Sequence, residues 1–449
     1  MTNADRDVKL VDTPFCYKQW KLAGNPATFF NELISDFGNF IHYRGLFDMY
    51  IANHPELVKT ILKDTNQNFD KNSILYNQFR KAFGNGLVVS EGDHWRRQRK
   101  LMQPMFSPSA IKQFFEVMLD STRKKTEQWQ NHCSRGEVFN IAEDMNVLTL
   151  EIAGRALFNE GFDQVSDKIG YWTKCINHYS ASLPLPIISH PHFPLPANLK
   201  FSKAIQEFRL FLKDMVDSRC QATNRNDLLS VLLQQRHEES GNTMSESELI
   251  EEVLGMIVGG HETSSSALAW TWYELHNNPG VTDKLHEELD RVIGARVMTL
   301  EDVPKLKYTR MIVDEVLRLH PPFWFENRNC MNDVELGGAL LPKGSMVIFS
   351  RYSLHRNPAF WNQPDQFIPE RFDDSREENR RHHHAFVPFG GGPRICIGIN
   401  FAMMELIVVL ATIAQRYRVI VDKSDRHEMS AHLTMEPKYG VKVRLEKRS

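Results

Sequence analysis

The sequence predicts a mainly helical protein with a minor β component. Apolar residues recur at helical spacing over several long segments, whereas the β patterns are short and lie in the N-terminal part and the last third of the chain. Ser245 and Glu248 form a capping box, which opens a helical pattern that continues to Asn277. At 1.5 Å per residue this helix would be roughly 48 Å long. Because no internal repeat or long low-complexity linker divides residues 1–449, we expect a single domain.

Turn and cap signals assign the other elements. Residues 40–43 and 47–53 flank Arg44-Gly45 and predict a hairpin, after which His54-Pro55 opens a helix. Further helices are expected over residues 111–129, 139–158, 308–319 and 399–416, and short strands near Gly337-Gly338 and over residues 345–349, 418–421 and 441–445.

A proline-rich segment interrupts the helical pattern over residues 183–199. Its five prolines remove backbone donors and block helix continuation. A surface linker explains the segment, but its apolar side chains fit a lid over an apolar pocket at least as well.

Composition and charge exclude several classes of protein. The chain has 54 Lys and Arg against 56 Asp and Glu, so no global field favours nucleic acid or an acidic membrane. The N-terminus is polar and without a signal peptide, and the apolar run 401–414 is too short to span a membrane and contains Glu405. The 6 cysteines are scattered without paired spacing. We therefore expect a soluble, monomeric protein of the reducing cytoplasm, with no nucleic-acid partner and no stable membrane insertion.

The most informative segment is Phe389-Gly-Gly-Gly-Pro-Arg-Ile-Cys-Ile-Gly398. Its glycines allow the backbone to approach a flat ligand closely. A helix N-terminus just beyond Cys396 would lower the pKa of its thiol and stabilise a metal-binding thiolate. A buried free cysteine is the usual alternative for a single Cys, but the surrounding pattern favours the ligand.

This segment resembles the haem-binding signature of the cytochrome P-450 family, F-x-x-G-x-R-x-C-x-G, at every fixed position. The resemblance implies that Cys396 is the proximal ligand of the iron of haem b, because a thiolate favours O–O cleavage. Phe389 would pack near it, Arg394 would reach a haem propionate, and Gly398 completes the signature. The resemblance also implies the family's mainly helical fold, with the haem between the long helix and the cysteine loop.

Two more segments match the family and imply a buried ionic triad. Glu315 and Arg318 lie three apart on one helix face, and Pro369-Glu-Arg-Phe372 contributes Arg371. Glu-x-x-Arg alone is weak evidence, because a solvated helix pair explains it equally well.

The long helix contains Gly259-Gly-His-Glu-Thr263, which resembles the family's oxygen-binding groove. A structural kink is the alternative, because glycines and hydroxyl residues are poor helix formers. Carried over from the family, Thr263 orders a water near the bound dioxygen and Glu262 relays protons. Both are therefore the expected catalytic residues.

Further cofactor contacts are expected from Trp95 and Arg99, which resemble the family's W-x-x-x-R, and from Arg328 and His355. For the last two a surface position is the alternative. Arg96, Arg97 and Lys100 present either a basic face to an acidic electron donor or a solvated helix face.

The resemblance implies a monooxygenase that inserts one oxygen atom of O2 into a lipophilic small molecule, in natural-product or lipid metabolism. We find no G-x-G-x-x-G unit, so electrons from NAD(P)H should arrive through separate partners, a ferredoxin or flavodoxin with its reductase. A peroxide-driven peroxygenase and a non-catalytic haem-thiolate sensor are the alternatives, and the pair Glu262-Thr263 argues against both.

By family position, the substrate pocket should draw on residues 71–89, 183–199, 256–260, 323–326 and 433–435. Phe323, Trp324 and Phe325 predict an aromatic-lined cavity. A fatty acid or a polyketide is the expected kind of substrate. Glu326 would either contact a polar substrate group or turn outward to pair with an arginine, and we favour the second.

Overall fold

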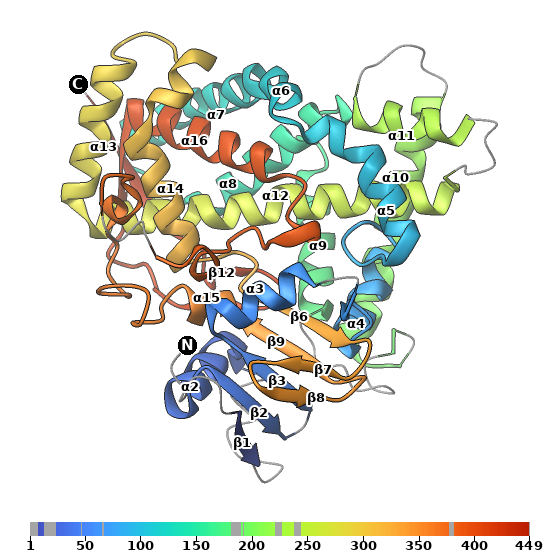
Figure 1. Ribbon diagram of the computed structural model, residues 1–449. Helices are drawn as coiled ribbons and strands as arrows, with labels where there is room; N and C mark the ends of the chain where they lie inside the picture. Colours follow the sequence, from blue (N-terminus) through green and yellow to red (C-terminus); the bar gives the residue numbers. More distant parts are fainter. Residues whose placement is uncertain are drawn as a thin grey trace.

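A computed structural model describes residues 8–12, 24–45, 47–64, 67–180, 190–191, 193–220, 227–237, 244–376 and 381–448. A helical layer forms the larger part of the molecule, and a β-sheet lies beside it with the N-terminal strand at its far edge (Figure 1). The helices of the described residues are α2 (Pro26–Phe37), α3 (Pro55–Lys63), α4 (Ile74–Phe83), α5 (Gly92–Met102), α6 (Pro108–Ile111), α7 (Phe115–Arg135), α8 (Ile141–Ala153), α9 (Ser166–Ser180), α10 (Pro196–Cys220), α11 (Leu228–His237), α12 (Glu246–Asn277), α13 (Pro279–Val292), α14 (Lys307–Leu319), α15 (Arg351–Leu354) and α16 (Ile399–Arg416).

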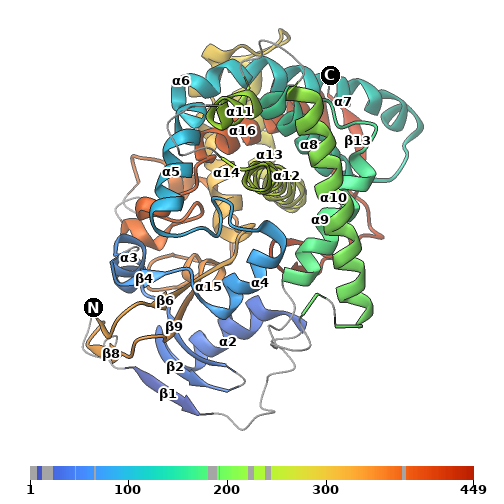
Figure 2. The same cartoon turned by 90° about the vertical axis from the view of Figure 1, so that its right-hand side faces the viewer.

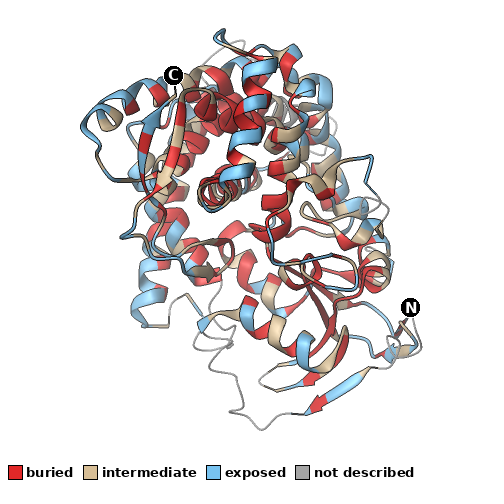
Figure 3. Ribbon diagram, turned by 90° about the vertical axis from the view of Figure 1, so that its left-hand side faces the viewer, coloured by how far each residue is buried: buried red, intermediate tan, exposed pale blue. Residues whose placement is uncertain are grey.

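The long helix α12 organises the helical layer. Ser245 caps it with the predicted capping box, and it ends at Asn277, before Asn278 and Pro279. Figure 2 shows α12 end-on, with α8, α10, α11, α14 and α16 arranged around it. Most of its side chains are therefore buried on all sides (Figure 3). A helix that is enclosed in this way can carry functional groups at a fixed position inside the protein.

The main sheet has six strands in the order β1-β2-β3-β9-β6-β4, and smaller sheets pair β10 with β13 and β5, β11 with β12, and β7 with β8. The strands are β1 (Lys9–Asp12), β2 (Phe40–Arg44), β3 (Asp48–Ala52), β4 (Phe69–Asp70), β5 (Phe139–Asn140), β6 (Phe325–Cys330), β7 (Val334–Leu336), β8 (Ala339–Leu341), β9 (Met346–Ser350), β10 (Tyr417–Val421), β11 (Met429–Ala431), β12 (Met435–Pro437) and β13 (Lys442–Lys447). The predicted hairpin is β2 and β3, which pair antiparallel. The structure adds β6, which the sequence did not predict as a strand, between β9 and β4.

Two of the helix predictions were too long or shifted. The pattern over 139–158 is α8 followed by a wider turn, Gly154–Phe158. The pattern over 111–129 begins with short turns, and the long helix α7 starts only at Phe115 and continues to Arg135. In the proline-rich segment, residues 183–189 and 192 lie outside the described residues, and Pro196 opens α10.

α16 is the helix of the described residues that is long and apolar enough to cross a membrane. Its 18 residues make the prediction that this run is too short wrong. However, 67% of the window is buried inside the protein, which is typical of a core helix, and Glu405 in its middle is fully buried.

Candidate functional site

The cysteine loop is held between α3, α5 and α16. Gly390 and Gly392 have φ values of +73° and +62°, which favour glycine. A Cβ on Gly392 would lie 2.1 Å from the carbonyl oxygen of Leu62 at the end of α3, so no other residue fits there without movement. The Cys396 N–H donates to the Phe389 carbonyl at 3.0 Å, which closes the loop. α16 begins directly after Gly398, so its N-terminus faces the cysteine.

The Cys396 side chain is accessible to solvent, although the loop and α16 surround it with protein atoms. Desolvation by these protein atoms raises the pKa of the Cys396 thiol, while the Gly398 N–H and the charge of Arg99 oppose this increase. The expected lowering of this pKa was therefore wrong for the thiol by itself, because desolvation outweighs the helix N-terminus. A bound metal ion would supply the missing stabilisation, since a coordinating thiol loses its proton.

The ionic triad is confirmed. Arg318 makes two contacts with the Glu315 carboxylate, at 2.7 and 2.8 Å, and Arg371 Nε adds a third at 3.0 Å. All three side chains have at most 1% of their surface exposed. The arginines also donate to backbone carbonyls of residues 355, 362–364 and 366. The triad therefore fixes the irregular segment that leads to the cysteine loop.

Cationic side chains from α5 and the loop lie next to Cys396. Arg99 Nη1 donates to the Ile395 carbonyl at 2.8 Å, one residue before the cysteine. The Arg394 guanidinium stacks 3.8 Å from the centre of the Trp95 ring and pairs with Glu91 at 2.6 Å. Burial lowers the pKa of Arg394 to about 10, against the attraction of Glu91. The structure thus brings together Trp95, Arg99 and Arg394, as predicted from their sequence motifs.

Lys71 belongs to the same cationic cluster, which the sequence did not predict. Its Nζ donates to the Val88 carbonyl at 2.7 Å. Burial, together with the charges of Arg328 and Arg394, lowers its pKa to about 7. Burial contributes most to this decrease, and the two arginines add to it more than Glu326 and Glu91 oppose it, so the charges around Lys71 are mainly positive.

Arg328 lies inside the protein, so its surface alternative is wrong. Its side chain has no exposed surface and pairs with Glu326, which also pairs with Arg351. Burial raises the pKa of Glu326, but Arg328, Arg351 and Lys71 outweigh it and lower this pKa to about 2. Glu326 does pair with an arginine, as favoured from the sequence, but inside the protein and not on its surface. Arg328 Nε has no hydrogen-bond partner among the described residues, and the expected cofactor contact of Arg328 stays a prediction.

His355 is likewise enclosed. It is 0% exposed, and its Nε2 accepts a hydrogen bond from the Val387 N–H at 3.0 Å. Burial, with Arg351, Arg318 and Arg356 nearby, holds the pKa of His355 well below its ordinary value. The surface alternative is therefore wrong, whereas the propionate contact stays a prediction, and His355 Nδ1 has no hydrogen-bond partner among the described residues.

α12 exposes a narrow strip of backbone in the interior. Gly259 is exposed, and a Cβ built on it would meet nothing within 4 Å, whereas Val258 and His261 beside it are buried. Thr263 Oγ1 donates to the Gly259 carbonyl at 2.9 Å along this strip. The helix is continuous here, so the predicted groove is a gap in side-chain cover and not a break in α12.

Glu262 lies in a polar group formed by α12, α9 and the residues before β12. The Asn177 amide donates to Glu262 at 3.4 Å and to Thr434 Oγ1 at 2.7 Å. Burial, and then the nearby Glu436 carboxylate, raise the pKa of Glu262 well above its ordinary value. The surroundings of Glu262 therefore favour its protonated form.

The three aromatic residues expected in the pocket form one cluster. Trp324 is 2% exposed, packs against Phe30 and donates to the His432 carbonyl at 2.8 Å, so it belongs to the core. The Phe325 ring lies 4.5 Å from the Trp324 ring and 5.9 Å from the Phe323 ring, measured between ring centres. Phe323 is half-buried at the edge of this cluster.

Comparison with known proteins decides which family this arrangement belongs to. The family model for cytochrome P450 matches residues 13–443, nearly the whole chain. The chain belongs to the cytochrome P450 family. The chain is similar to the cyclooctat-9-en-7-ol 5-monooxygenase of Streptomyces melanosporofaciens, with 34% identity over 82% of this chain and 80% of that one. It is also similar to the pentalenene oxygenase of Streptomyces avermitilis, with 30% identity over 90% of this chain and 89% of that one. The crystal structure of the cytochrome P450DA haem domain superposes with a TM-score of 0.86 and 25% identity, covering 98% of both chains.

As a cytochrome P450, the protein is a monooxygenase that uses haem iron and acts on a lipophilic substrate. The residues fit a haem in three respects. The Cys396 thiol is exposed between structured elements, the cluster around Arg394 has a surplus of positive charge that suits carboxylates, and the Gly259 strip leaves room for a flat ring.

Proposed function

We propose that Cys396 is the axial ligand of the haem iron and that Trp95, Arg99 and Arg394 hold the haem carboxylates. The haem iron, when bound, supplies the activation of dioxygen. Arg99 is well placed to contact the haem. Its guanidinium donates to the Ile395 carbonyl, one residue before Cys396, and its positive charge acts on the Cys396 thiol. Phe389 and Gly398 shape the loop through the Phe389 carbonyl and the start of α16. The exposed thiol in this cationic surrounding is the observation that carries the assignment.

We infer that Glu262 and Thr263 control the protons of the reaction. Burial raises the pKa of Glu262 and so favours the form that carries a proton, and the Asn177 amide orients its carboxyl group. The Thr263 hydroxyl lies next to the uncovered Gly259 backbone, where it can position a water molecule. Delivery of protons from a buried acid through a hydroxyl group is general acid catalysis.

We propose a terpenoid as the substrate and hydroxylation in natural-product biosynthesis as the reaction. The names of the relatives support this class, since they are oxygenases of cyclooctatenol and pentalenene. The exposed apolar side chain of Val88, which approaches Gly255 of α12, supports an apolar cavity. Terpenoids therefore replace the fatty acids and polyketides expected from the sequence.

We further propose that a ferredoxin or flavodoxin, reduced from NAD(P)H by its reductase in the cytoplasm, donates the electrons to a monomer. The outer face of α5 supports a docking role. Arg96 and Arg97 are already paired with Asp93 and Glu248, so of the three basic side chains considered for this face the exposed Lys100 would meet an acidic partner.

An optical titration of the haem-loaded ferric protein tests this function. We expect a saturable Soret shift with polycyclic terpene alcohols or hydrocarbons, and then a product one oxygen atom heavier with NAD(P)H, ferredoxin and reductase. A shift with fatty acids alone would overturn the substrate class. Turnover with hydrogen peroxide alone would indicate a peroxygenase, and binding without any product would indicate a sensor. Cys396→Ser should lose the Soret position typical of thiolate ligation in the reduced, CO-bound protein.

A further inference from the structure

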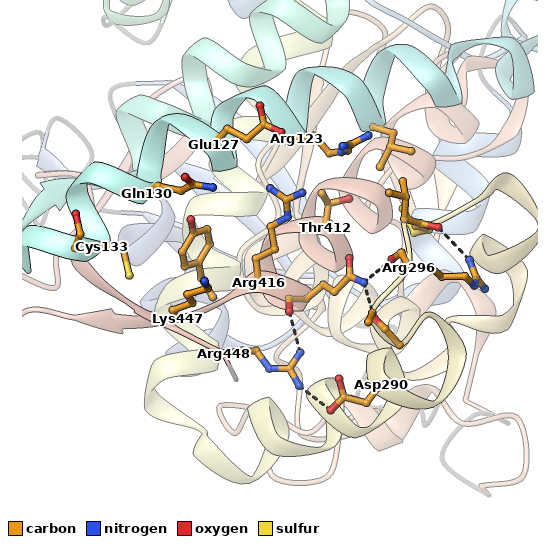
Figure 4. A pocket seen from close by; sticks show the side chains of 18 residues that line it. Arg123, Glu127, Gln130, Cys133, Asp290, Arg296, Thr412, Arg416, Lys447 and Arg448 are labelled. Carbon is orange, nitrogen blue, oxygen red and sulfur yellow. Dashed lines mark hydrogen bonds and ion pairs between the residues drawn. The ribbon is translucent and has the colours of Figure 1, made fainter.

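A large cleft lies away from the cysteine loop, at the other end of α16. Its volume is about 1160 Å³, and it lies between α7, the segment after α13, the end of α16 and the C-terminal strand β13 (Figure 4). Thr412, which lines it, is thirteen positions beyond Ile399, so it lies roughly 20 Å along the helix from the N-terminus of α16. The cleft is therefore separate from the haem site.

Positive charge prevails in this cleft. Five cationic side chains and two carboxylates line it, namely Arg123, Arg296, Arg416, Lys447, Arg448, Glu127 and Asp290. Arg448 pairs with Asp290 at 2.8 Å, and Arg296 pairs with Asp302 at 2.6 Å outside the lining. Arg123, Arg416 and Lys447 form no ion pair with any residue in the part of the chain that the structure describes. Glu127 likewise forms no ion pair among the described residues, so three cationic side chains and one carboxylate remain, and the positive surplus is available to an anion.

Two buried polar atoms in the cleft have no hydrogen-bond partner within the described structure. Thr412 is 3% exposed and its Oγ1 is unsatisfied, and Arg123, which is half-buried, has a buried Nε without a partner. Figure 4 shows Thr412 and the guanidinium groups of Arg123 and Arg416 directed toward the same part of the cleft. Arg416 is oriented by a hydrogen bond of 3.0 Å to Thr126 Oγ1. A buried donor without an acceptor costs stability, which an acceptor from outside would restore.

The remaining lining is apolar. Leu119 and Met298 belong to the core, while Val297 is 46% exposed at the edge of the cleft. A ligand could therefore place an anionic group at the arginines and an apolar group against Leu119, Met298 and Val297, in different parts of the cleft. Two guanidinium forks, an ammonium and a hydroxyl suit the several oxygens of a phosphate group better than the two of a carboxylate.

We propose that this cleft binds a phosphate-bearing small molecule, with its phosphate group on Arg123, Arg416 and Thr412. The ligand is either free phosphate or a phosphate ester whose apolar part contacts Leu119 and Val297. This site is independent of the proposed oxygenation, because none of its residues belongs to the haem site.

Calorimetric titration of the haem-loaded protein in a phosphate-free buffer tests the proposal, with inorganic phosphate and hexyl phosphate as probes. We expect saturable binding. Tighter binding of hexyl phosphate would identify a phosphate ester as the ligand, and equal binding would identify free phosphate. Arg123→Gln should weaken binding at least about tenfold, and Thr412→Val about fivefold, since each removes a donor to the phosphate group.

Two controls separate the site from general effects. Lys124→Gln removes the same charge from α7 on a side chain that is paired with Asp120 outside the cleft, and should leave binding unchanged. Thr412→Val should keep or raise the unfolding midpoint, because it removes an unsatisfied hydroxyl. Absence of saturable binding of both probes would overturn the proposal. Equal weakening by Lys124→Gln, or unchanged binding in both cleft variants, would do the same.

Discussion

Glu405, in the middle of α16, allows a direct test of how a buried carboxyl group affects the stability of this fold. It is 0% exposed, and neither carboxyl oxygen has a hydrogen-bond partner of good geometry within the described residues. Burial raises its pKa to about 8, which the nearby Ser264 hydroxyl offsets only in part. Glu405 is therefore neutral in the folded protein at pH 7 and ionised in the unfolded chain.

This difference makes stability depend on pH. Because the folded-state pKa is raised, the folded protein binds more protons than the unfolded chain between the two values, so stability falls as the pH rises. From the ordinary value of 4.5 and the raised value of about 8, we expect wild type to lose roughly 3 kcal/mol through this residue between about pH 5 and about pH 8. Glu405→Gln has no proton to lose and should not show this loss.

The assay is urea unfolding of the haem-loaded wild type and Glu405→Gln at several pH values in this range. The stability of the variant relative to wild type should increase steadily with pH. Glu116→Gln, on an exposed position of α7, reports any general effect of removing one carboxylate. A difference between wild type and Glu405→Gln that stays constant with pH would refute the argument, because it would mean that Glu405 is hydrated or paired in the folded state.

Three further predictions concern the haem side of the molecule. Glu315→Gln should cost about 3–5 kcal/mol in urea unfolding, because two buried guanidinium groups lose their carboxylate; a loss below 1 kcal/mol would contradict a buried triad. Gly392→Ala should lower the haem content, measured as the ratio of Soret to protein absorbance, because its Cβ collides with the Leu62 carbonyl at a positive φ. Gly280→Ala, where a Cβ meets open space, should leave that ratio unchanged. Glu262→Gln should keep the contact with Asn177 but lower kcat by roughly 10²-fold, since the amide cannot donate a proton; an unchanged kcat and pH profile would remove Glu262 from the proton path.

Local signals predicted the elements that depend on local physics. The capping box at Ser245 and the proline after Asn278 give the bounds of α12, and the predicted bounds of α16 agree with the structure. Strand β6 was missed, because its sequence FENRNC carries polar side chains where a buried strand normally has apolar ones. Only the tertiary structure shows that Glu326 and Arg328 of this strand neutralise each other inside the protein.

The same limit applies to the site. Motif spacing was sufficient to group Trp95, Arg99 and Arg394 and to predict the ionic triad. It could not give the direction of the Cys396 pKa, because the helix N-terminus is visible in the sequence while the desolvation that outweighs it is not. Lys71 was missed for a similar reason, since only the fold brings it beside Arg328 and Arg394.

Two unsatisfied polar side chains on one helix require two different explanations. Such groups are rare in folded proteins, and both Glu405 and Thr412 belong to α16. For Glu405 a change of protonation is sufficient, because a neutral carboxyl group costs far less to bury than a carboxylate. Thr412 has no group that titrates, and Arg123 Nε in the same cleft also lacks an acceptor among the described residues, so an acceptor from outside is needed to satisfy both. The two explanations therefore predict separable effects: Glu405→Gln should remove pH dependence without changing phosphate binding, and Thr412→Val should weaken phosphate binding without changing pH dependence.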